Sequence, residues 1–234
     1  MDNLDPAERD HFADLALTWW DRDGPSRTLH DINPCRLDYV RNGRPLAGLA
    51  IADIGCGGGL LSEALAREGA QVTAIDATAP LIAVANAHAA TSGLAIDYRV
   101  QLSRALATEC PGRFALVTCM ELIEHVPDAD ALIADCAALL EPGGELVVST
   151  LNRSPAAYLL GIVAAEYVLG IVPRGTHDYA QFLRPAELAA SGRRHGLVLT
   201  DVRGMRYNPV TRRAHIGGPP LVNYLARLRR AANE

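Results

Sequence analysis

The stretch that decides the fold is Asp53-Ile54-Gly55-Cys56-Gly57-Gly58-Gly59, which joins the apolar run Leu49–Ile54 to a leucine- and alanine-rich segment of helical length. A strand that passes through a glycine-rich turn into a helix is typical of ligand-binding parallel α/β sheets. Glycines let the chain turn sharply, and they let a ligand approach the backbone. Gly55, Gly57 and Gly59 therefore predict a ligand site at the carboxyl end of the first strand.

The spacing of these glycines separates two kinds of ligand. The dinucleotide pattern G-x-G-x-x-G would need glycine at position 60, where the chain has Leu60, whereas D-x-G-x-G-x-G fits residues 53 to 59. Asp53 offers a carboxylate, which favours a ligand that carries an ammonium and a sulfonium over a pyrophosphate. A glycine loop that serves only a tight turn is the alternative interpretation.

Short β-type runs alternate with helical segments from residue 49 to 150, and this predicts a parallel sheet with crossover helices. We expect strands at 49–54, 71–76, 96–100, 114–119 and 145–150, and helices at 60–68, 80–92 and 129–140. A helix at 185–195 and a strand from Leu197 should follow. The prediction is a Rossmann-like, doubly wound, mostly parallel sheet, with a helical N-terminal lead-in and a helical insertion after the fifth strand.

The length of 234 residues suits one domain, which we divide into four parts. These are a lead-in at 1–45, a cofactor-binding core at 46–150, an apolar insertion at 151–183 and a C-terminal completion at 184–234. The net charge of −5 argues against a nucleic-acid partner. Five cysteines without a C-x-x-C pair, and an N-terminus without an apolar run, predict reduced thiols in the cytoplasm.

Asp76 ends the second predicted strand, 23 positions after Asp53. A carboxylate at this place can accept both ribose hydroxyls of a nucleoside that lies over the edge of the sheet. Nicotinamide-dependent enzymes use the same device, so Asp76 supports an adenosine ligand without selecting one. A helix cap for the segment near Pro80 is the alternative role.

A second constellation follows the fourth predicted strand. Glu121, Glu124 and His125 stand at i, i+3 and i+4, so in a helical turn all three would project from one face. Two carboxylates and an imidazole could hold magnesium or manganese, and the imidazole makes zinc or iron conceivable. A capped, solvated turn with a structural histidine is the alternative.

Several longer blocks resemble the bacterial ubiquinone-biosynthesis O-methyltransferases, which are class I enzymes dependent on S-adenosylmethionine. The resemblance runs from Phe12 to about Tyr224. It is carried by W-W-D at 19–21, L-H-D-I-N-P-C-R-L at 29–37, the glycine motif, T-C-M-E at 118–121 with E-H-V at 124–126, S-T-L-N-R at 149–153, P-R-G-T-H-D at 173–178 and Y-N-P at 207–209. The glycine motif is common among methyltransferases, and the flanking blocks are more selective.

The resemblance implies contacts with S-adenosylmethionine at Arg36, Gly55, Asp76 and Met120. It also implies catalytic or divalent-metal duty, with magnesium expected, for the E-x-x-E-H residues. The substrates would be a polyprenylated phenol and a demethylated ubiquinol. Where relatives carry acidic residues after the third strand this chain has Gln101, so Gln101 or Ser103 would have to contact the adenine.

The apolar run Tyr158–Val172 bears on how a polyprenyl tail reaches the site. Its fifteen residues are too few to span a hydrocarbon core of about 30 Å. The run could lie in the membrane interface, anchored by Arg153 and Arg174, or pack against the sheet. The resemblance implies that residues 156–174 bind the inner face of the cytoplasmic membrane, and a ubiquinone-synthesis assembly is a further candidate partner.

Two other classes of protein, and a methyltransferase with a different substrate, are the alternatives. If the chain were a nicotinamide-dependent oxidoreductase, it would lack the third glycine of the dinucleotide pattern, and its E-x-x-E-H residues would have no role. A non-catalytic scaffold would be expected to lose Glu121, Glu124 and His125, and all three are present. A methyltransferase of another small aromatic substrate is the serious rival.

Overall fold

The computed structural model describes residues 3–158 and 179–232, and its described strands form one mixed sheet. The strand order is β3-β2-β1-β4-β5-β8-β6-β7. The strands are β1 (Ala50–Ile54), β2 (Gln71–Asp76), β3 (Asp97–Val100), β4 (Phe114–Met120), β5 (Leu140–Leu151), β6 (Leu197–Asn208), β7 (Arg213–Ile216) and β8 (Asn223–Arg230).

The first five strands are all parallel, as the alternation of strands and helices predicts. β8 then pairs antiparallel with both β5 and β6, and β7 pairs antiparallel with β6. Because β1 to β5 run the same way, their carboxyl ends meet at one edge of the sheet. The strand order reverses between β1 and β4, and the crevice for a ligand opens at such a point.

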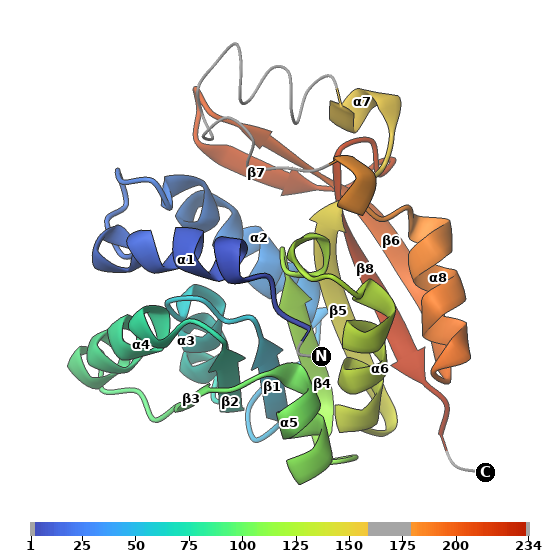
Figure 1. Cartoon of the computed structure of the whole chain (residues 1–234), viewed down its shortest axis with the longest axis horizontal. Helices are drawn as coiled ribbons and strands as arrows, with labels where there is room; N and C mark the ends of the chain where they lie inside the picture. The colour runs from blue at the N-terminus through green and yellow to red at the C-terminus, as the bar shows by residue number, and fades with distance from the viewer. Residues whose placement is uncertain (1–2, 159–178, 233–234) are drawn as a thin grey trace.

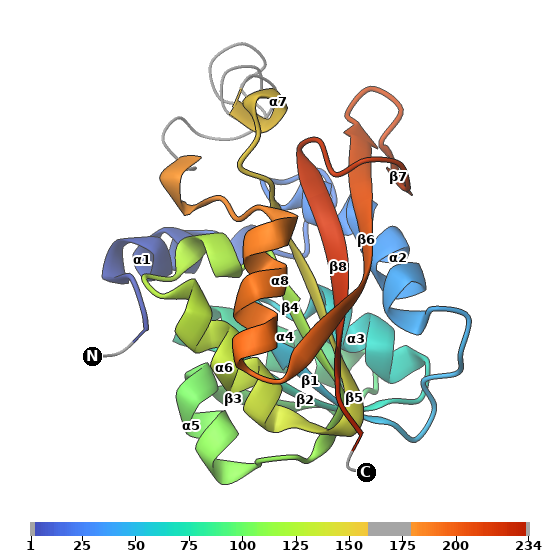
Figure 2. The same ribbon diagram turned by 90° about the vertical axis from the view of Figure 1, so that its right-hand side faces the viewer.

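Helices cover both faces of the sheet (Figures 1 and 2). The helices of more than three residues are α1 (Pro6–Asp14), α2 (Arg27–Arg41), α3 (Leu60–Arg67), α4 (Ala79–Thr91), α5 (Ser103–Glu109), α6 (Ala129–Leu139) and α8 (Pro185–Arg194). The shorter ones are η1 (Ala16–Thr18), η2 (Ile123–His125), α7 (Pro155–Ala157) and η4 (Tyr179–Gln181). In the figures α2, α3 and α4 lie on one face, and α5, α6 and α8 lie on the other.

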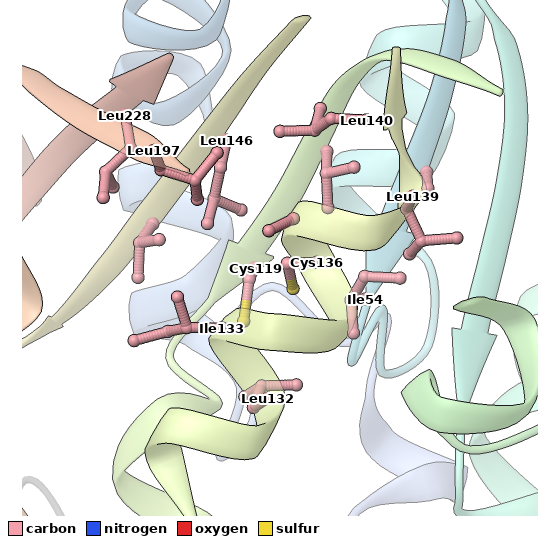
Figure 3. Packing of buried hydrophobic residues seen from close by; sticks show 14 of the residues in the cluster. Ile54, Cys119, Leu132, Ile133, Cys136, Leu139, Leu140, Leu146, Leu197 and Leu228 are labelled. Carbon is pink, nitrogen blue, oxygen red and sulfur yellow. The ribbon is translucent and has the colours of Figure 1, made fainter. Parts of the chain in front are cut away.

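Two apolar clusters fill the space between the sheet and these helices. Figure 3 shows the first, in which α6 sets Leu132, Ile133 and Cys136 against β4 and β5. The second joins α2 and α3 to the opposite face of the sheet. Cys119 and Cys136 are unbridged and lie within the first cluster.

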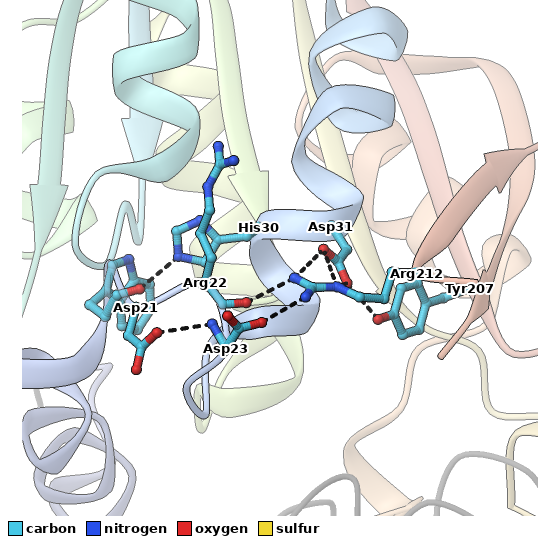
Figure 4. Close-up of polar contacts among 8 residues, drawn as sticks. Asp21, Arg22, Asp23, His30, Asp31, Tyr207 and Arg212 are labelled. Carbon is cyan, nitrogen blue, oxygen red and sulfur yellow. Dashed lines mark hydrogen bonds and ion pairs between the residues drawn. The ribbon is translucent and has the colours of Figure 1, made fainter. Parts of the chain in front are cut away.

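The lead-in is held to the C-terminal hairpin of β6 and β7 by polar contacts (Figure 4). The Arg212 guanidinium donates to Asp31 at 3.0 and 3.1 Å, and to Asp23 at 2.7 Å. The Tyr207 hydroxyl donates to Asp31 at 2.7 Å. These contacts therefore join the lead-in to the hairpin of β6 and β7, although the two segments are far apart in the sequence.

A buried arginine ties β8 to the lead-in. Arg227 is 4% exposed, and it donates to Glu145 of β5 at 2.6 Å and to the carbonyl oxygens of Tyr39 and Val40 at the end of α2. Arg44 donates to the same Glu145 oxygen at 2.7 Å. Removing one partner of a buried ion pair leaves the other charge without compensation.

We expect Arg227→Ala to lower the free energy of unfolding by about 3 kcal/mol, because Glu145 and two carbonyl oxygens lose a buried donor. Urea unfolding followed by circular dichroism measures the change. Arg229→Ala is the matched control, since Arg229 is exposed on the same strand, and its cost should stay within about 0.5 kcal/mol. Equal effects of the two substitutions would contradict the assignment.

Candidate active site

The glycine loop follows β1 and is closely packed. Gly55 has φ +71°, and a Cβ there would stand 2.7 Å from Leu122; Gly57 has φ +55°, and its Cβ would stand 2.6 Å from Trp19. Both positions require glycine, because L-residues rarely adopt such φ values and the space is occupied. The N–H groups of Gly55 and Cys56 donate to the Ile75 carbonyl at 2.9 and 3.0 Å, which fixes the loop beside β2.

Asp76 ends β2 as predicted and faces the glycine loop. Its carboxylate accepts the Gly57 N–H at 2.9 Å and the Thr78 N–H at 2.8 Å. Burial raises its pKa, against the opposing effect of these hydrogen bonds. Thr78, not Asp76, is the N-cap residue of α4. Each carboxylate oxygen keeps a further acceptor position, so both could receive hydroxyl donors of a ligand.

Asp53 lies beneath the loop and not at its surface. It is 2% exposed, and it accepts the Ser62 hydroxyl at 2.6 Å and the Thr118 hydroxyl at 2.7 Å. Burial raises its pKa, and the two hydroxyl donors oppose that rise. These contacts connect β1 to α3 and β4, and a contact of Asp53 with the ligand stays a prediction.

Arg36 connects α2 to the acidic residues after β4. It is 6% exposed, and its Nη2 donates to Glu121 Oε1 at 3.0 Å. The Ser149 hydroxyl of β5 donates to the same oxygen at 2.8 Å. Arg36 Nε is buried, and it has no hydrogen-bond partner among the described residues. Met120, 8% exposed, precedes Glu121 at the end of β4.

Glu124 is buried next to Glu121. It is 5% exposed and accepts the Thr150 hydroxyl at 2.8 Å. Its pKa is raised well above the ordinary value, first by burial and then by the charge of Glu121, with which it shares a hydrogen bond. Burial and a neighbouring carboxylate both favour the protonated form of Glu124.

Glu121, Glu124 and His125 do not lie on one face of a helical turn, so the prediction that all three project from one face is wrong. Glu121 has φ +49° and precedes η2, which covers only Ile123–His125. His125 turns to the lead-in, where Nδ1 lies 3.0 Å from Glu8 Oε2 and the ring meets Phe12 edge-on at 5.3 Å. Within residues 3–158 and 179–232, no three His, Cys, Asp or Glu residues form a group that could hold a metal ion.

The two residues expected near an adenine are both engaged with the protein. Gln101 donates its backbone N–H to the Asp76 carbonyl at 3.0 Å and its side-chain amide to Glu109 at 3.2 Å. The Ser103 hydroxyl donates to Asp135 at 2.8 Å. An adenine contact by either residue stays a prediction.

Ser149 and Thr150 were missed as site residues. They are fully buried neighbours on β5, and they point to opposite faces of the sheet, where one holds Glu121 and the other Glu124. The signal was present in the sequence, since two hydroxyl residues end the apolar run of this strand. Only the pairing of β4 with β5 shows which carboxylates they hold.

Comparisons with known proteins agree with this geometry. A family model described as a methyltransferase domain matches residues 51–144. A ubiquinone biosynthesis O-methyltransferase of Xanthomonas euvesicatoria pv. vesicatoria is 55% identical, over 96% of this chain and 94% of the relative. One of the same name from Xanthomonas axonopodis pv. citri is 54% identical with the same coverage.

A solved structure is similar in fold. It is magnesium protoporphyrin IX methyltransferase from Synechocystis PCC 6803 with bound SAH, with a TM-score of 0.69 at 20% identity, and the match covers 96% of this chain and 98% of that one. The sheet order, the glycine loop and the acid that ends β2 define a class I S-adenosylmethionine-dependent methyltransferase. The chain belongs to the family of ubiquinone biosynthesis O-methyltransferases.

The raised pKa of Glu124 predicts a pH effect on stability. A carboxyl group whose pKa is raised on folding stabilises the fold fully below its ordinary pKa, and this contribution is lost as pH rises toward the folded pKa. Glu124→Gln keeps the shape and does not titrate. Its unfolding free energy, relative to wild type, should therefore increase from pH 5 to pH 8.

The measurement is urea unfolding at both pH values with EDTA present, so that no divalent cation contributes. Glu141→Gln, at an exposed position of β5, is the matched control, and its difference from wild type should stay constant. A Glu124→Gln difference that is also constant would contradict the role of burial.

Proposed function

We propose that this chain transfers the methyl group of S-adenosylmethionine to ring hydroxyls of polyprenylated phenol and demethylated ubiquinol intermediates. The observation that carries the proposal is the pair formed by the buried Glu124 and the partly exposed Glu121 beside the glycine loop, in a member of this family. An active methyltransferase needs groups that hold or receive a proton next to the methyl donor, and this pair supports that role. A different small aromatic substrate is the alternative.

The loop and its surroundings suit a positively charged cofactor. Asp53 is buried and Asp76 is half-buried, and both have raised pKa values, so a nearby sulfonium and ammonium would favour their charged forms. Asp76 supports the ribose contact through its remaining acceptor positions. The unpaired Arg36 Nε supports binding of the cofactor's carboxylate. Backbone approach at Gly55, Gly57 and Gly59 and the side chain of Met120 complete the proposed cofactor site.

The ring hydroxyl must lose its proton to attack the methyl carbon, because a phenol with pKa near 10 is a weak nucleophile at neutral pH. Glu124 is the proposed acceptor of this proton, because a raised pKa makes its carboxylate a stronger base. Arg36 and Ser149 orient Glu121, whose charge maintains that pKa. His125, paired with Glu8, is the second candidate base.

A divalent cation, magnesium in particular, is part of the proposal for the Glu121–Glu124 pair. Magnesium commonly binds one or two carboxylates and completes its shell with water or substrate, so two adjacent carboxylates fit it without His125. A bound cation would lower the pKa of the ring hydroxyl. It would also relieve the repulsion between the two carboxylates.

Turnover of a short-chain demethylubiquinol, with methylated product identified by mass, tests the proposal. We expect product with magnesium, and a loss on the order of 10²- to 10⁴-fold in Glu124→Gln. Glu141→Gln is the control. Failure to methylate the quinol, with turnover of a tail-less catechol, would favour the alternative substrate. Full turnover after exhaustive chelation would exclude the cation and leave Glu124 as proton acceptor.

Membrane docking through residues 156–174 is proposed for delivery of the substrate. Residues 159–178, with most of this segment and Arg174, lie outside the described residues, so the support is the apolar sequence. In the described part of the chain, no helix has the length and apolar character needed to cross a bilayer. Arg153, expected as an anchor, donates to Glu187 and to the Ala180 carbonyl.

We expect the protein to float with liposomes that contain anionic lipid, and we expect flotation to weaken when Leu159, Leu160 and Val168 are replaced by serine, because apolar area drives interfacial binding. Val210→Ser is the matched control, since Val210 is 91% exposed in the turn between β6 and β7. Unchanged flotation of the triple variant would refute docking through this segment.

A further inference from the structure

The only two tryptophans of the chain, Trp19 and Trp20, both contact the glycine loop. Trp19 is 5% exposed, and its ring lies along the loop: a Cβ on Gly57 or Gly58 would stand 2.6 or 2.3 Å from ring atoms. The glycines therefore make room for an indole of the lead-in as well as for a ligand.

The indole N–H of Trp19 is buried, and within the described residues it has no hydrogen-bond partner. Trp19 Nε1 lies 2.7 Å from the position that a Gly58 Cβ would occupy, so this donor is at the loop itself. Leaving a buried donor unsatisfied is unfavourable, and a fold tolerates it where a ligand supplies the acceptor. Four more buried polar atoms without a described partner belong to the same lead-in: Ser26 Oγ, Asn33 Oδ1, Arg36 Nε and Arg44 Nε.

Trp20, the next residue, contacts the same loop. Its Nε1 donates to the Gly58 carbonyl at 3.0 Å, and its ring stacks on His88 of α4 with centroids 3.4 Å apart and planes at 4°. His88 Nδ1 lies 2.6 Å from Glu63 Oε1, and Glu63 of α3 is 2% exposed. Trp20 thus connects the lead-in to the loop and, through His88, to α4 and α3.

We propose that Trp19 is a cofactor-binding residue, whose indole N–H donates to an oxygen acceptor of bound S-adenosylmethionine while its ring forms one wall of the cofactor pocket. The cofactor supplies such acceptors in its carboxylate and ribose hydroxyls. The inference rests on the methyltransferase class and on the loop geometry. It does not depend on the quinol substrate.

The first test is calorimetric titration with S-adenosylhomocysteine, which binds without reaction and without a quinol, so failure here is distinct from failure of the proposed substrate. Trp19→Phe keeps an apolar ring and removes the N–H donor, and we expect about tenfold weaker binding. Leu17→Ala, 97% exposed in the same lead-in, is the matched control and should bind as the wild type does. Wild-type affinity in Trp19→Phe would overturn the proposal.

A second measurement applies even if Trp19→Phe does not fold. In Trp20→Phe, Trp19 is the only tryptophan, so its emission reports on its own surroundings. We expect saturating S-adenosylhomocysteine to shift the emission maximum, because the indole gains a hydrogen-bond acceptor and a new neighbour. An unchanged spectrum at saturation, confirmed by calorimetry on the same variant, would overturn the proposal.

Discussion

The buried carboxylate of Asp53 is the interaction on which the site depends. Its two oxygens hold Ser62 of α3 and Thr118 of β4, so one side chain joins the strand before the glycine loop, the helix after it and the neighbouring strand. This junction lies at the point where the sheet order reverses between β1 and β4. The loop is held in place there by further bonds beneath it, including those from Gly55 and Cys56 to Ile75.

The Glu121–Glu124 pair is unfavourable for the stability of the fold. Glu121 occupies a left-handed backbone conformation that is unfavourable for a non-glycine residue, and Glu124 is buried against its charge. Arg36, Ser149 and Thr150 offset part of that cost with charge-assisted hydrogen bonds. Arg36 comes from α2 and the two hydroxyl donors come from β5, so all three donors are distant in sequence from the pair and meet it only in the folded protein.

The sequence predicted the parallel core because glycine spacing and alternating apolar runs are local signals. β2 was placed with its observed bounds, and other core boundaries differed by one or two residues, except for β5, which begins at Leu140. β8 was not predicted, because its buried Arg227 interrupts the apolar pattern and is satisfied only by distant groups on α2 and β5. His125 was misplaced for a related reason: spacing assumed a helical turn, whereas the partner that determines its position, Glu8, lies 117 residues away along the chain.

The candidate site combines residues inside the range matched by the methyltransferase family model with residues outside it. Residues 51–144 contain the glycine loop, Asp76 and the two glutamates, which many methyltransferases could use in common. Arg36 and the tryptophans come before that range, and Ser149 and Thr150 come after it. These flanking residues decide how the loop and the carboxylates are presented, because they supply the donors that orient Glu121 and Glu124 and the rings that cover Gly57 and Gly58. The lead-in is therefore part of the candidate site: without it, Glu121 would lose its only described cationic partner and the loop would lose the indole that packs on it.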